Sequence, residues 1–332
     1  MPITSEGSKQ KKISPSMDLS QQIVEAEKRI RPFIRETPIE YSYALNKISG
    51  CEVYLKLENL QVTGSFKARG ALNKILSLKN STAKIVTAST GNHGLGVANA
   101  LAVAKKQGTI YLPHGASAAK VEAIEMRGVL VEFYGDNCEE TERYVRKVSE
   151  TTHQIYVSPY NDVEVMAGQG SVGVELLRQL PEMDSVFISV GGGGLIAGIA
   201  AHLKAVNPKI EVIGCLPENA PVMFECIKAG KIMEVPEKPT LSDATAGVIE
   251  AGSITFKICQ QCINDYVLVT EDEIAESMRL VLKHHHQVIE GSAGVALAAL
   301  LKNKEKFQGK KVVVLICGGN VSEAVLKKLI CN

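Results

Sequence analysis

The stretch S189-V-G-G-G-G-L-I-A-G198 places four consecutive glycines between an apolar strand-like run and an apolar helical run. Glycine lets the backbone take positive φ angles and approach a ligand closely. The helix that follows offers unpaired N–H groups and a partial positive charge, so the turn predicts an anion site, most naturally for a phosphate. A tight crossover from strand to helix, without a ligand, would also explain the glycines. The stretch is not a Walker A loop, because no Gly-Lys-Ser/Thr follows, and it does not fit the dinucleotide pattern G-x-G-x-x-G cleanly.

The alternation of strand and helix continues along the chain. Short runs rich in valine and isoleucine recur, most of them followed by Gly, Ser or Pro, at residues 52–57, 84–89, 109–113, 129–134, 154–158, 185–190, 211–216, 266–269 and 311–317. Helical stretches lie between them at residues 95–107, 118–127, 139–151, 195–206, 271–285 and 293–302, and Thr270 and Glu273 form a capping box before one of these. This order predicts an α/β fold whose parallel strands are covered by helices on both faces.

Composition limits the possible partners and compartments. The 332 residues are 45% hydrophobic and 22% charged, with a net charge of +1 and no tryptophan. This argues for a globular chain of two domains or one large one, and against a broad surface for nucleic acid or acidic lipid. No apolar run reaches the roughly 18 residues of a membrane helix. Residues 1–17 are polar and lack the apolar core of a secretory signal, so we expect a disordered tail. Eight scattered cysteines favour a reducing compartment, and we expect a cytoplasmic protein.

A second stretch, T63-G-S-F-K-A-R-G-A-L72, predicts a tight turn at Gly64, a helix cap at Ser65 and then the start of a helix. Lys67 therefore adds a cation to the first turn of a helix, where the macrodipole makes positive charge mildly unfavourable. A solvated side chain is the ordinary explanation for a lone lysine. Another explanation is an amine whose task does not require it to stay charged.

Two further polar turns, S89-T-G-N-H-G94 and C317-G-G-N-V-S322, also follow strands. Ligands of open parallel sheets bind at the carboxyl ends of the strands. A phosphate cradle, an amine at the start of a helix and two polar turns together favour one cofactor. Pyridoxal phosphate needs a phosphate cradle, a Schiff-base lysine and a partner for its pyridine nitrogen.

Five motifs carry a resemblance to a known family: G64-S-F-K-A-R-G70, S89-T-G-N-H-G94, the four glycines, E290-G-S-A-G294 and C317-G-G-N320. In this order and spacing, the chain from about residue 19 to its end resembles the fold-type-II pyridoxal-phosphate enzymes. The similarity is to the serine/threonine dehydratase and serine racemase branch. It implies a fold like that of the tryptophan synthase β subunit, with two open, twisted, parallel-rich sheets flanked by helices.

The resemblance also implies residue roles. Lys67 would hold the cofactor's aldehyde as an imine and, with Thr90, act in catalysis. The other implied cofactor contacts are Phe66, Asn92, Gly191, Gly192, Gly193, Gly194, Leu195, Glu290 and Cys317. Among these, Asn92 would bind the ring hydroxyl, the glycines the phosphate, and Cys317 the side of the pyridine nitrogen. The implied substrate-binding loop is Ser89, Thr90, Gly91, Asn92 and His93.

The implied reaction is β-elimination of L-threonine or L-serine, giving 2-oxobutyrate or pyruvate and ammonia. A neutral thiol at Cys317 would delocalise less carbanion charge into the ring than a carboxylate would, which favours elimination over transamination. Without its motif, Cys317 could simply be a small buried apolar residue. Three alternatives stay open: a serine racemase, a lyase for another β-hydroxy amino acid (threo-3-hydroxyaspartate, phenylserine or a hydroxyectoine-derived substrate), and a non-enzymatic phosphate sensor or scaffold. Intact Lys67 argues against the last.

One difference from the racemases concerns their catalytic serine, which matches Thr90 here. The extra methyl group restricts the threonine rotamer, so the sequence favours a dehydratase. Some relatives also carry a divalent metal after the strand at 211–216. The stretch C215-L-P-E-N-A-P-V222 has apolar residues where acidic ligands would be needed, so we expect no metal. For the three histidines at 284–286 and the pair Cys259 and Cys262 we expect solvated positions on helix surfaces.

The resemblance implies a domain organisation as well. We expect a large cofactor-binding domain made of residues 18–80 and 160–332, and a small inserted α/β domain of residues 81–159. Closure of the small domain over the cleft would exclude water. A homodimer or homotetramer is implied, and the absence of a regulatory domain favours a catabolic enzyme. The only partner expected from the sequence is a small amino-acid substrate.

Overall fold

The computed structural model describes residues 15–331. Most of the tail predicted at residues 1–17 lies outside this range, and its last three residues belong to the first helix. The α-helices are α1 (Pro15–Ile30), α2 (Tyr43–Ser49), α3 (Lys67–Ser77), α4 (Asn92–Ala104), α5 (Ala118–Glu125), α6 (Cys138–Thr152), α7 (Val163–Gln179), α8 (Gly194–Val206), α9 (Val222–Ala229), α10 (Ile254–Cys262), α11 (Glu271–His285), α12 (Gly291–Lys302) and α13 (Glu323–Cys331). The strands are β1 (Ile39–Tyr41), β2 (Glu52–Leu57), β3 (Ile85–Ala88), β4 (Gly108–Leu112), β5 (Leu130–Phe133), β6 (Ile155–Tyr156), β7 (Ser185–Ser189), β8 (Glu211–Pro217), β9 (Asp265–Val269) and β10 (Lys311–Ile316).

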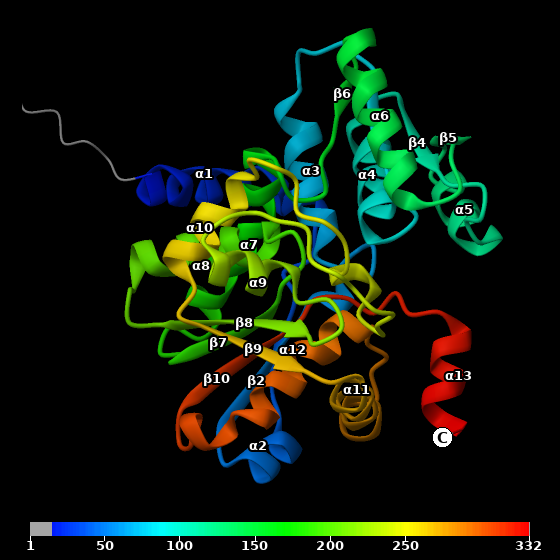
Figure 1. Cartoon of the computed structure of the whole chain (residues 1–332). Helices are drawn as coiled ribbons and strands as arrows, with labels where there is room; N and C mark the ends of the chain where they lie inside the picture. Colours follow the sequence, from blue (N-terminus) through cyan, green and yellow to red (C-terminus); the bar gives the residue numbers. More distant parts are fainter. Residues whose placement is uncertain (1–14, 332) are drawn as a thin grey trace, which may run out of the picture.

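The larger sheet contains six of the described strands in the order β1-β2-β10-β7-β8-β9. Only β1 runs antiparallel to its neighbour; the remaining pairs are parallel. Figure 1 shows α1, α7 and α8 above this sheet and α2, α11 and α12 below it. The strands β7 and β10 are almost completely buried because both of their faces are covered. The predicted α/β class with two parallel-rich sheets is confirmed.

The smaller sheet has the order β5-β4-β3-β6, and all of its pairs are parallel. Together with α4, α5 and α6 it forms the upper right part of Figure 1. All four strands fall between residues 81 and 159, and the division into domains at these residues remains a prediction. Buried residues of α1, α3 and α7, among them Ile30, Leu72 and Val165, belong to the same core as this sheet.

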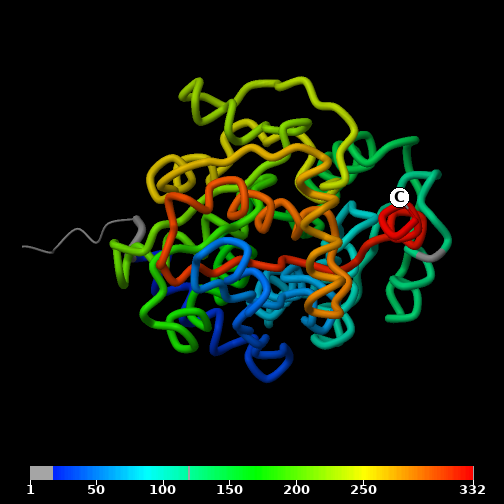
Figure 2. Tube along the Cα trace, turned by 90° about the horizontal axis from the view of Figure 1, so that it is seen from below, coloured from blue at the N-terminus to red at the C-terminus, as the bar shows by residue number. Residues whose placement is uncertain are grey.

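The sequence predicted most elements correctly but missed one strand. Each of the nine predicted strand runs overlaps one strand from β2 to β10. The missed strand, β1, has only three residues, none of them buried, so it carries no apolar pattern. The capping box of Thr270 and Glu273 is confirmed, because each side chain bonds to the other residue's main-chain N–H. Helix α13 lies at the periphery in both views (Figures 1 and 2).

Two predictions about surface residues were wrong. Cys259 is fully buried and Cys262 is 8% exposed, because α10 turns both toward the core beside α8. The side chain of His285 is only 6% exposed, and its ring bonds to Ser42 (2.7 Å) and Glu40 (3.0 Å), which joins α11 to β1 and to the residue that follows it. The side chains of His284 and His286 are exposed as expected.

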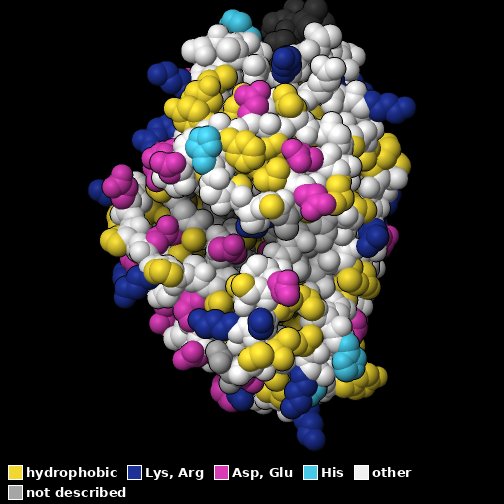
Figure 3. Space-filling model, turned by 90° about the vertical axis from the view of Figure 1, so that its right-hand side faces the viewer, with side chains coloured by type: hydrophobic (Ala, Val, Ile, Leu, Met, Phe, Trp, Pro, Cys, Tyr) yellow, Lys and Arg dark blue, Asp and Glu magenta, His cyan; other side chains and the backbone are white. Residues whose placement is uncertain are grey.

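The described residues contain neither a cluster suited to a metal ion nor a helix suited to a membrane. No group of three or more His, Cys, Asp or Glu side chains in residues 15–331 could hold a metal ion. No helix in this part of the chain is both long and apolar enough to cross a membrane. Side chains of both charges are interspersed on the face shown in Figure 3, and no broad area of that face carries a single charge.

Candidate active site

A cavity of about 1120 Å³ is lined by elements of both sheets. The turn after β7, the start of α3 and the end of β10 contribute from the larger sheet, while α6 and the start of α4 contribute from the smaller one. The predicted cofactor residues all line this cavity: Phe66, Lys67, Asn92, Gly191, Gly192, Gly193, Gly194, Leu195, Glu290 and Cys317. Phe66 and Cys317, which are 251 positions apart in the sequence, therefore meet at the carboxyl ends of parallel strands, where ligands of such sheets bind.

The glycine turn is built for close approach. Gly193 has a φ of +86°, which side chains rarely allow, and α8 begins at Gly194. A Cβ atom on Gly192 would lie 2.5 Å from the ring of Tyr160, so a larger residue does not fit there. The first N–H groups of α8 have no partner within the helix and carry its positive pole toward the cavity. This arrangement fits a phosphate group.

Lys67 is the first residue of α3, and it lines the same cavity as this turn. Its Nζ donates a hydrogen bond to the main-chain carbonyl of Pro159 (2.8 Å). Burial lowers the pKa of the amine to about 8, although the carboxyl groups of Glu290 and Glu142 favour the charged form. An amine with this pKa is partly neutral near physiological pH and can therefore act as a base or a nucleophile.

The turn before Lys67 differs from the prediction in one respect. Gly64 has a φ of +73°, as the predicted tight turn requires. Ser65, however, does not cap α3, because the capping position is Phe66 and the Ser65 hydroxyl has no hydrogen-bond partner in the described part of the chain. The main chain holds the helix start instead: Ser65 pairs with Gly318, and the N–H of Phe66 donates to the carbonyl of Cys317 (3.1 Å).

A polar cluster of Asn92, Glu290 and Asn320 forms another wall of the site. The Nδ2 of Asn92 lies 3.0 and 2.9 Å from the two carboxyl oxygens of Glu290. Asn320 donates to the Oδ1 of Asn92 (2.7 Å) and to the carbonyl of Thr63 (2.8 Å). Burial raises the pKa of Glu290 to about 7, although the bond from Asn92 opposes this shift.

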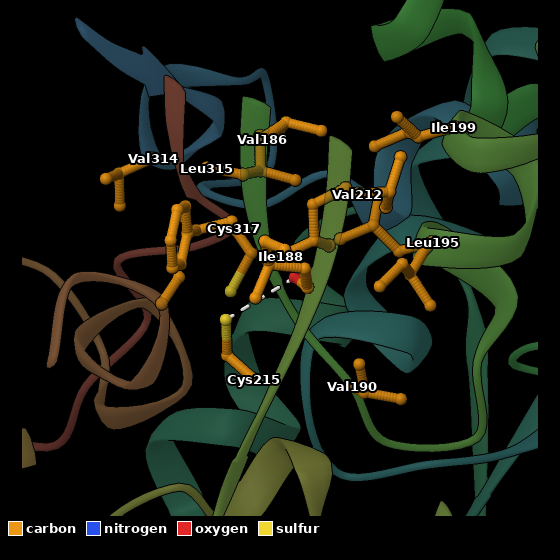
Figure 4. Packing of buried hydrophobic residues seen from close by; sticks show 14 of the residues in the cluster. Val186, Ile188, Val190, Leu195, Ile199, Val212, Cys215, Val314, Leu315 and Cys317 are labelled. Atoms are coloured by element: carbon orange, nitrogen blue, oxygen red, sulfur yellow. Dashed lines mark hydrogen bonds between the residues drawn. The ribbon is translucent and has the colours of Figure 1, made fainter. Parts of the chain in front are cut away.

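Cys317 directly follows β10 and faces the same wall. Its Sγ lies 4.0 Å from Glu290, and burial raises the pKa of the thiol well above its usual value. The group therefore stays neutral at physiological pH. Figure 4 shows Cys317 among buried side chains that come from β7, β8 and β10, including Ile188 and Leu315.

The predicted substrate loop lies at the start of α4, and only Asn92 of its members lines the cavity. Thr90 stands at the rim, where its hydroxyl is 3.9 Å from the thiol of Cys138. The ring of His93 is 3% exposed and its Nε2 bonds to the carbonyl of Val157 (2.9 Å), so it supports the loop from behind. Burial and the nearby Lys67 lower the pKa of His93 to about 3, which keeps the ring neutral.

Glu142, Arg146 and Glu250 line the cavity. Together with Tyr156 and Asn161, which contact them, they are here called the mouth cluster. Arg146 bonds to Glu142 (2.7 Å) and forms an ion pair with Glu250. Its guanidinium also lies 4.4 Å from the ring centre of Tyr156. Asn161 donates to the other oxygen of Glu250 (2.7 Å). These contacts join α6 to the loop before α10.

Sequence reasoning missed several residues of the site. The mouth cluster has no sequence signature because its members come from separate segments. Asn320 could have been assigned, since it belongs to the motif C317-G-G-N320. Gln169 and the carbonyl of Pro159 follow from no motif, although A167-G-Q-G170 places two glycines around the glutamine, a sign of close helix packing.

These features meet the requirements of pyridoxal phosphate: a cradle that only glycines fit, a buried amine of lowered pKa, and a neutral group at the end of a strand. A family model described as "Pyridoxal-phosphate dependent enzyme" matches residues 30–318, and the chain belongs to this family. The predicted membership of the fold-type-II enzymes and the predicted cofactor are thereby confirmed.

Two individual relatives and one solved structure show which members of the family this chain is similar to. The chain is 38% identical over 310 residues to the L-threonine ammonia-lyase of Thermotoga maritima, which covers 93% of this chain and 77% of that protein. It is 38% identical over 303 residues to L-threonine dehydratase catabolic TdcB of Escherichia coli (strain K12), covering 90% and 92%. The solved serine racemase of Dictyostelium discoideum superimposes with a TM-score of 0.84 at 36% identity, covering 91% of this chain and 98% of that one.

Proposed function

We propose that this protein is an ammonia-lyase that eliminates water from L-threonine, and also from L-serine. After hydrolysis the products are 2-oxobutyrate or pyruvate and ammonia. The observation that carries the proposal is the combination of Lys67 in the glycine-lined cavity with two relatives named for threonine, which cover at least 90% of the chain.

The chain's own residues account for binding and proton transfer. Gly191–Gly194 and the start of α8 would bind the cofactor's phosphate, and Lys67 would hold its aldehyde. When bound, pyridoxal phosphate supplies an electron sink that stabilises negative charge at the substrate's Cα. Lys67, released as a partly neutral amine, takes the proton from Cα; its lowered pKa keeps this possible near neutral pH.

The wall that contains Cys317 and Asn92 determines where the negative charge formed at Cα is stabilised. The thiol of Cys317 is neutral and provides no counter-charge for a protonated pyridine nitrogen. Asn92 faces the cavity at the start of α4 and is held by Asn320 and Glu290, so its amide is fixed before any ligand binds. This environment favours loss of the β-hydroxyl over storage of charge in the ring.

The test is a direct assay with purified protein and added pyridoxal phosphate. L-threonine, L-serine, D-serine and threo-3-hydroxyaspartate are supplied separately, and 2-oxo acid, ammonia and D-amino acid are measured. We expect 2-oxobutyrate from L-threonine, and a loss of at least about a thousandfold in Lys67→Ala, since both the covalent anchor and the base are removed. Absence of 2-oxo acid from both L-threonine and L-serine, with the cofactor bound, would contradict the proposal.

Serine racemisation is the second candidate, favoured by the Dictyostelium discoideum structure. Thr90 has a hydroxyl at the cavity rim, where it could return a proton from the other face. Conversion of L-serine mostly to D-serine would make this the principal activity. We expect Thr90→Ser to increase D-serine formation, because serine lacks the methyl group that restricts the threonine rotamer.

Two further expectations remain predictions. The resemblance implies a homodimer or homotetramer, which light scattering of the purified protein would measure. A cytoplasmic location is supported by eight cysteines that are all free thiols.

A further inference from the structure

We infer that Gln169 is a positioning residue, which fixes the main-chain carbonyl of Pro159. This carbonyl accepts a hydrogen bond from the Lys67 amine whenever that amine is free. The inference rests on the proposed function, in which Lys67 is alternately the cofactor's anchor and a free base. Pro159 lies between β6 and α7, where the chain passes from the smaller sheet back to the larger one.

Two donors share this carbonyl. The Nζ of Lys67 lies 2.8 Å from the oxygen of Pro159, and the Nε2 of Gln169 lies 3.3 Å from the same atom. A carbonyl oxygen has two lone pairs, so both are occupied when the lysine is free. When Lys67 is bound elsewhere, the bond from Gln169 keeps the carbonyl in place.

The orientation of the Gln169 amide is fixed by its surroundings. The residue is 1% exposed, and its Oε1 is buried with no hydrogen-bond partner among residues 15–331. Turning the amide over would put Oε1 against the Pro159 oxygen, and two acceptors repel each other. Oε1 therefore points toward the start of α8, where a Cβ atom on Gly194 would lie 2.7 Å from it. The Gln169 side chain therefore reaches from the Pro159 carbonyl, which accepts from Lys67, to the glycine turn.

Helix packing makes this geometry rigid. A Cβ atom on Gly168 would lie 2.5 Å from the carbonyl of Arg69, and one on Gly170 would lie 2.9 Å from Ile23. Gly168 thus lets α7 pack closely against α3, the helix that begins with Lys67, and Gly170 lets it pack closely against α1. Neither the amide nor the lysine backbone can shift without disturbing this contact.

The Pro159 carbonyl orients the Lys67 amine without adding charge. The ionisable groups facing Lys67 are Glu290 and Cys317 from the larger sheet's side, Glu142 from α6 and His93 from α4. None of them bonds to Nζ, whose partner is the neutral carbonyl. A carboxylate in that place would favour the ammonium form and raise the pKa of the amine, whereas a carbonyl leaves the amine able to lose its proton.

The first test is Gln169→Glu, which places a carboxylate no more than about 6 Å from Nζ. Cofactor-free protein is treated with acetic anhydride across a range of pH, and acetylation of Lys67 is quantified by mass spectrometry. We expect the pH midpoint to rise by about one unit, a tenfold smaller neutral fraction at a given pH. Gln260→Glu, the same change on the exposed surface of α10, should keep the wild-type midpoint. A wild-type midpoint in Gln169→Glu would overturn the inference.

The second test does not depend on the first variant folding. Gln169→Met keeps the length and volume of the side chain but cannot donate to Pro159. We expect Lys67 to capture added pyridoxal phosphate about tenfold more slowly, measured by the absorbance of the bound cofactor. An unchanged rate would also overturn the inference. Neither test uses an amino-acid substrate. A protein that fails to act on threonine would therefore refute the proposed function, while the two tests would still decide the inference about Gln169.

Discussion

Arg146 and Glu250 both line the cavity and form an ion pair, which joins helix α6 to the loop before α10. The side chains are 29% and 22% exposed, so water screens them only in part. Tyr156 stacks under the guanidinium and Asn161 holds the carboxylate from the other side. The mouth cluster therefore holds the two parts of the cavity wall together.

Breaking this contact should weaken the attachment of α6 to the loop before α10 in the cavity wall. For Arg146→Leu we expect kcat/KM for threonine to fall about tenfold, because water enters a site that works by excluding it. The thiol of Cys138 provides a direct measurement, since it is exposed and lines the cavity. In a Cys331→Ser background, alkylation of Cys138 in the presence of a substrate analogue should be faster for Arg146→Leu than for the parent.

The control is Arg143→Leu on the same helix. Arg143 is 72% exposed, and among residues 15–331 it pairs only with Glu139 (3.6 Å), so its loss should change neither rate by more than about twofold. Equal effects of the two variants would mean that the mouth cluster has no special role.

Arg69 should be essential for stability. It is fully buried, binds Glu58 through two bonds of 2.7 Å, and binds Glu175, whose second oxygen also bonds to Lys56. Burial opposes ionisation of Glu175, but Arg69 and Lys56 lower its pKa to about 2. Arg69→Leu would leave carboxylates buried without enough positive charge. We expect a loss of roughly 3–5 kcal/mol in the free energy of unfolding, measured with urea.

A surface arginine provides the comparison for this change. Arg178 is 47% exposed and pairs with Glu36 (2.9 Å). Arg178→Leu should cost less than about 1 kcal/mol. If Arg69→Leu were as stable as Arg178→Leu, the buried network would not be a stabilising element.

Features formed by neighbouring residues could be predicted from the sequence, whereas contacts between distant segments could not. The glycine turn and Lys67 carry their signals in a few neighbouring residues, and both proved to line the cavity. Cys259 was placed on the surface wrongly because a Cys-x-x-Cys spacing does not say which helix face is buried. The Arg146–Glu250 contact was beyond prediction, since it depends on how two distant segments pack.

The glycine turn should tolerate no side chain at Gly192. A Cβ atom there would lie 2.5 Å from the ring of Tyr160, so the turn or the ring must move. We expect Gly192→Ala to bind pyridoxal phosphate at least about tenfold more weakly, because the N–H groups would no longer converge on the phosphate. Gly115→Ala is the matched control, since an added Cβ meets nothing within 4 Å. Equilibrium titration by absorbance measures both, and equal affinities would contradict the model of the cradle.

Glu290 should make the cofactor-free protein less stable as pH rises. Its pKa is about 7 in the folded state, where burial raises it, and near 4.5 when unfolded. Between these values the folded state holds a proton that the unfolded state releases, so the free energy of unfolding falls by up to roughly 3 kcal/mol. Glu290→Gln should remove this dependence. Urea unfolding at about pH 5 and pH 7.5 measures it; an equal pH dependence in both proteins would disprove the assignment.

Cys317 offers a test of why the site would eliminate rather than transaminate. Cys317→Ser keeps a small neutral group beside Glu290, so we expect kcat for elimination to stay within about tenfold of wild type. Cys317→Asp introduces a carboxylate that would favour a protonated pyridine nitrogen and draw charge into the ring. Elimination should then slow by at least about tenfold, while slow conversion of the cofactor to its amine form, followed by absorbance, should increase. Cys215→Ser, at a buried thiol of β8, controls for loss of packing. If Cys317→Asp eliminated at the wild-type rate with no amine form, the neutral thiol would not determine the outcome of the reaction.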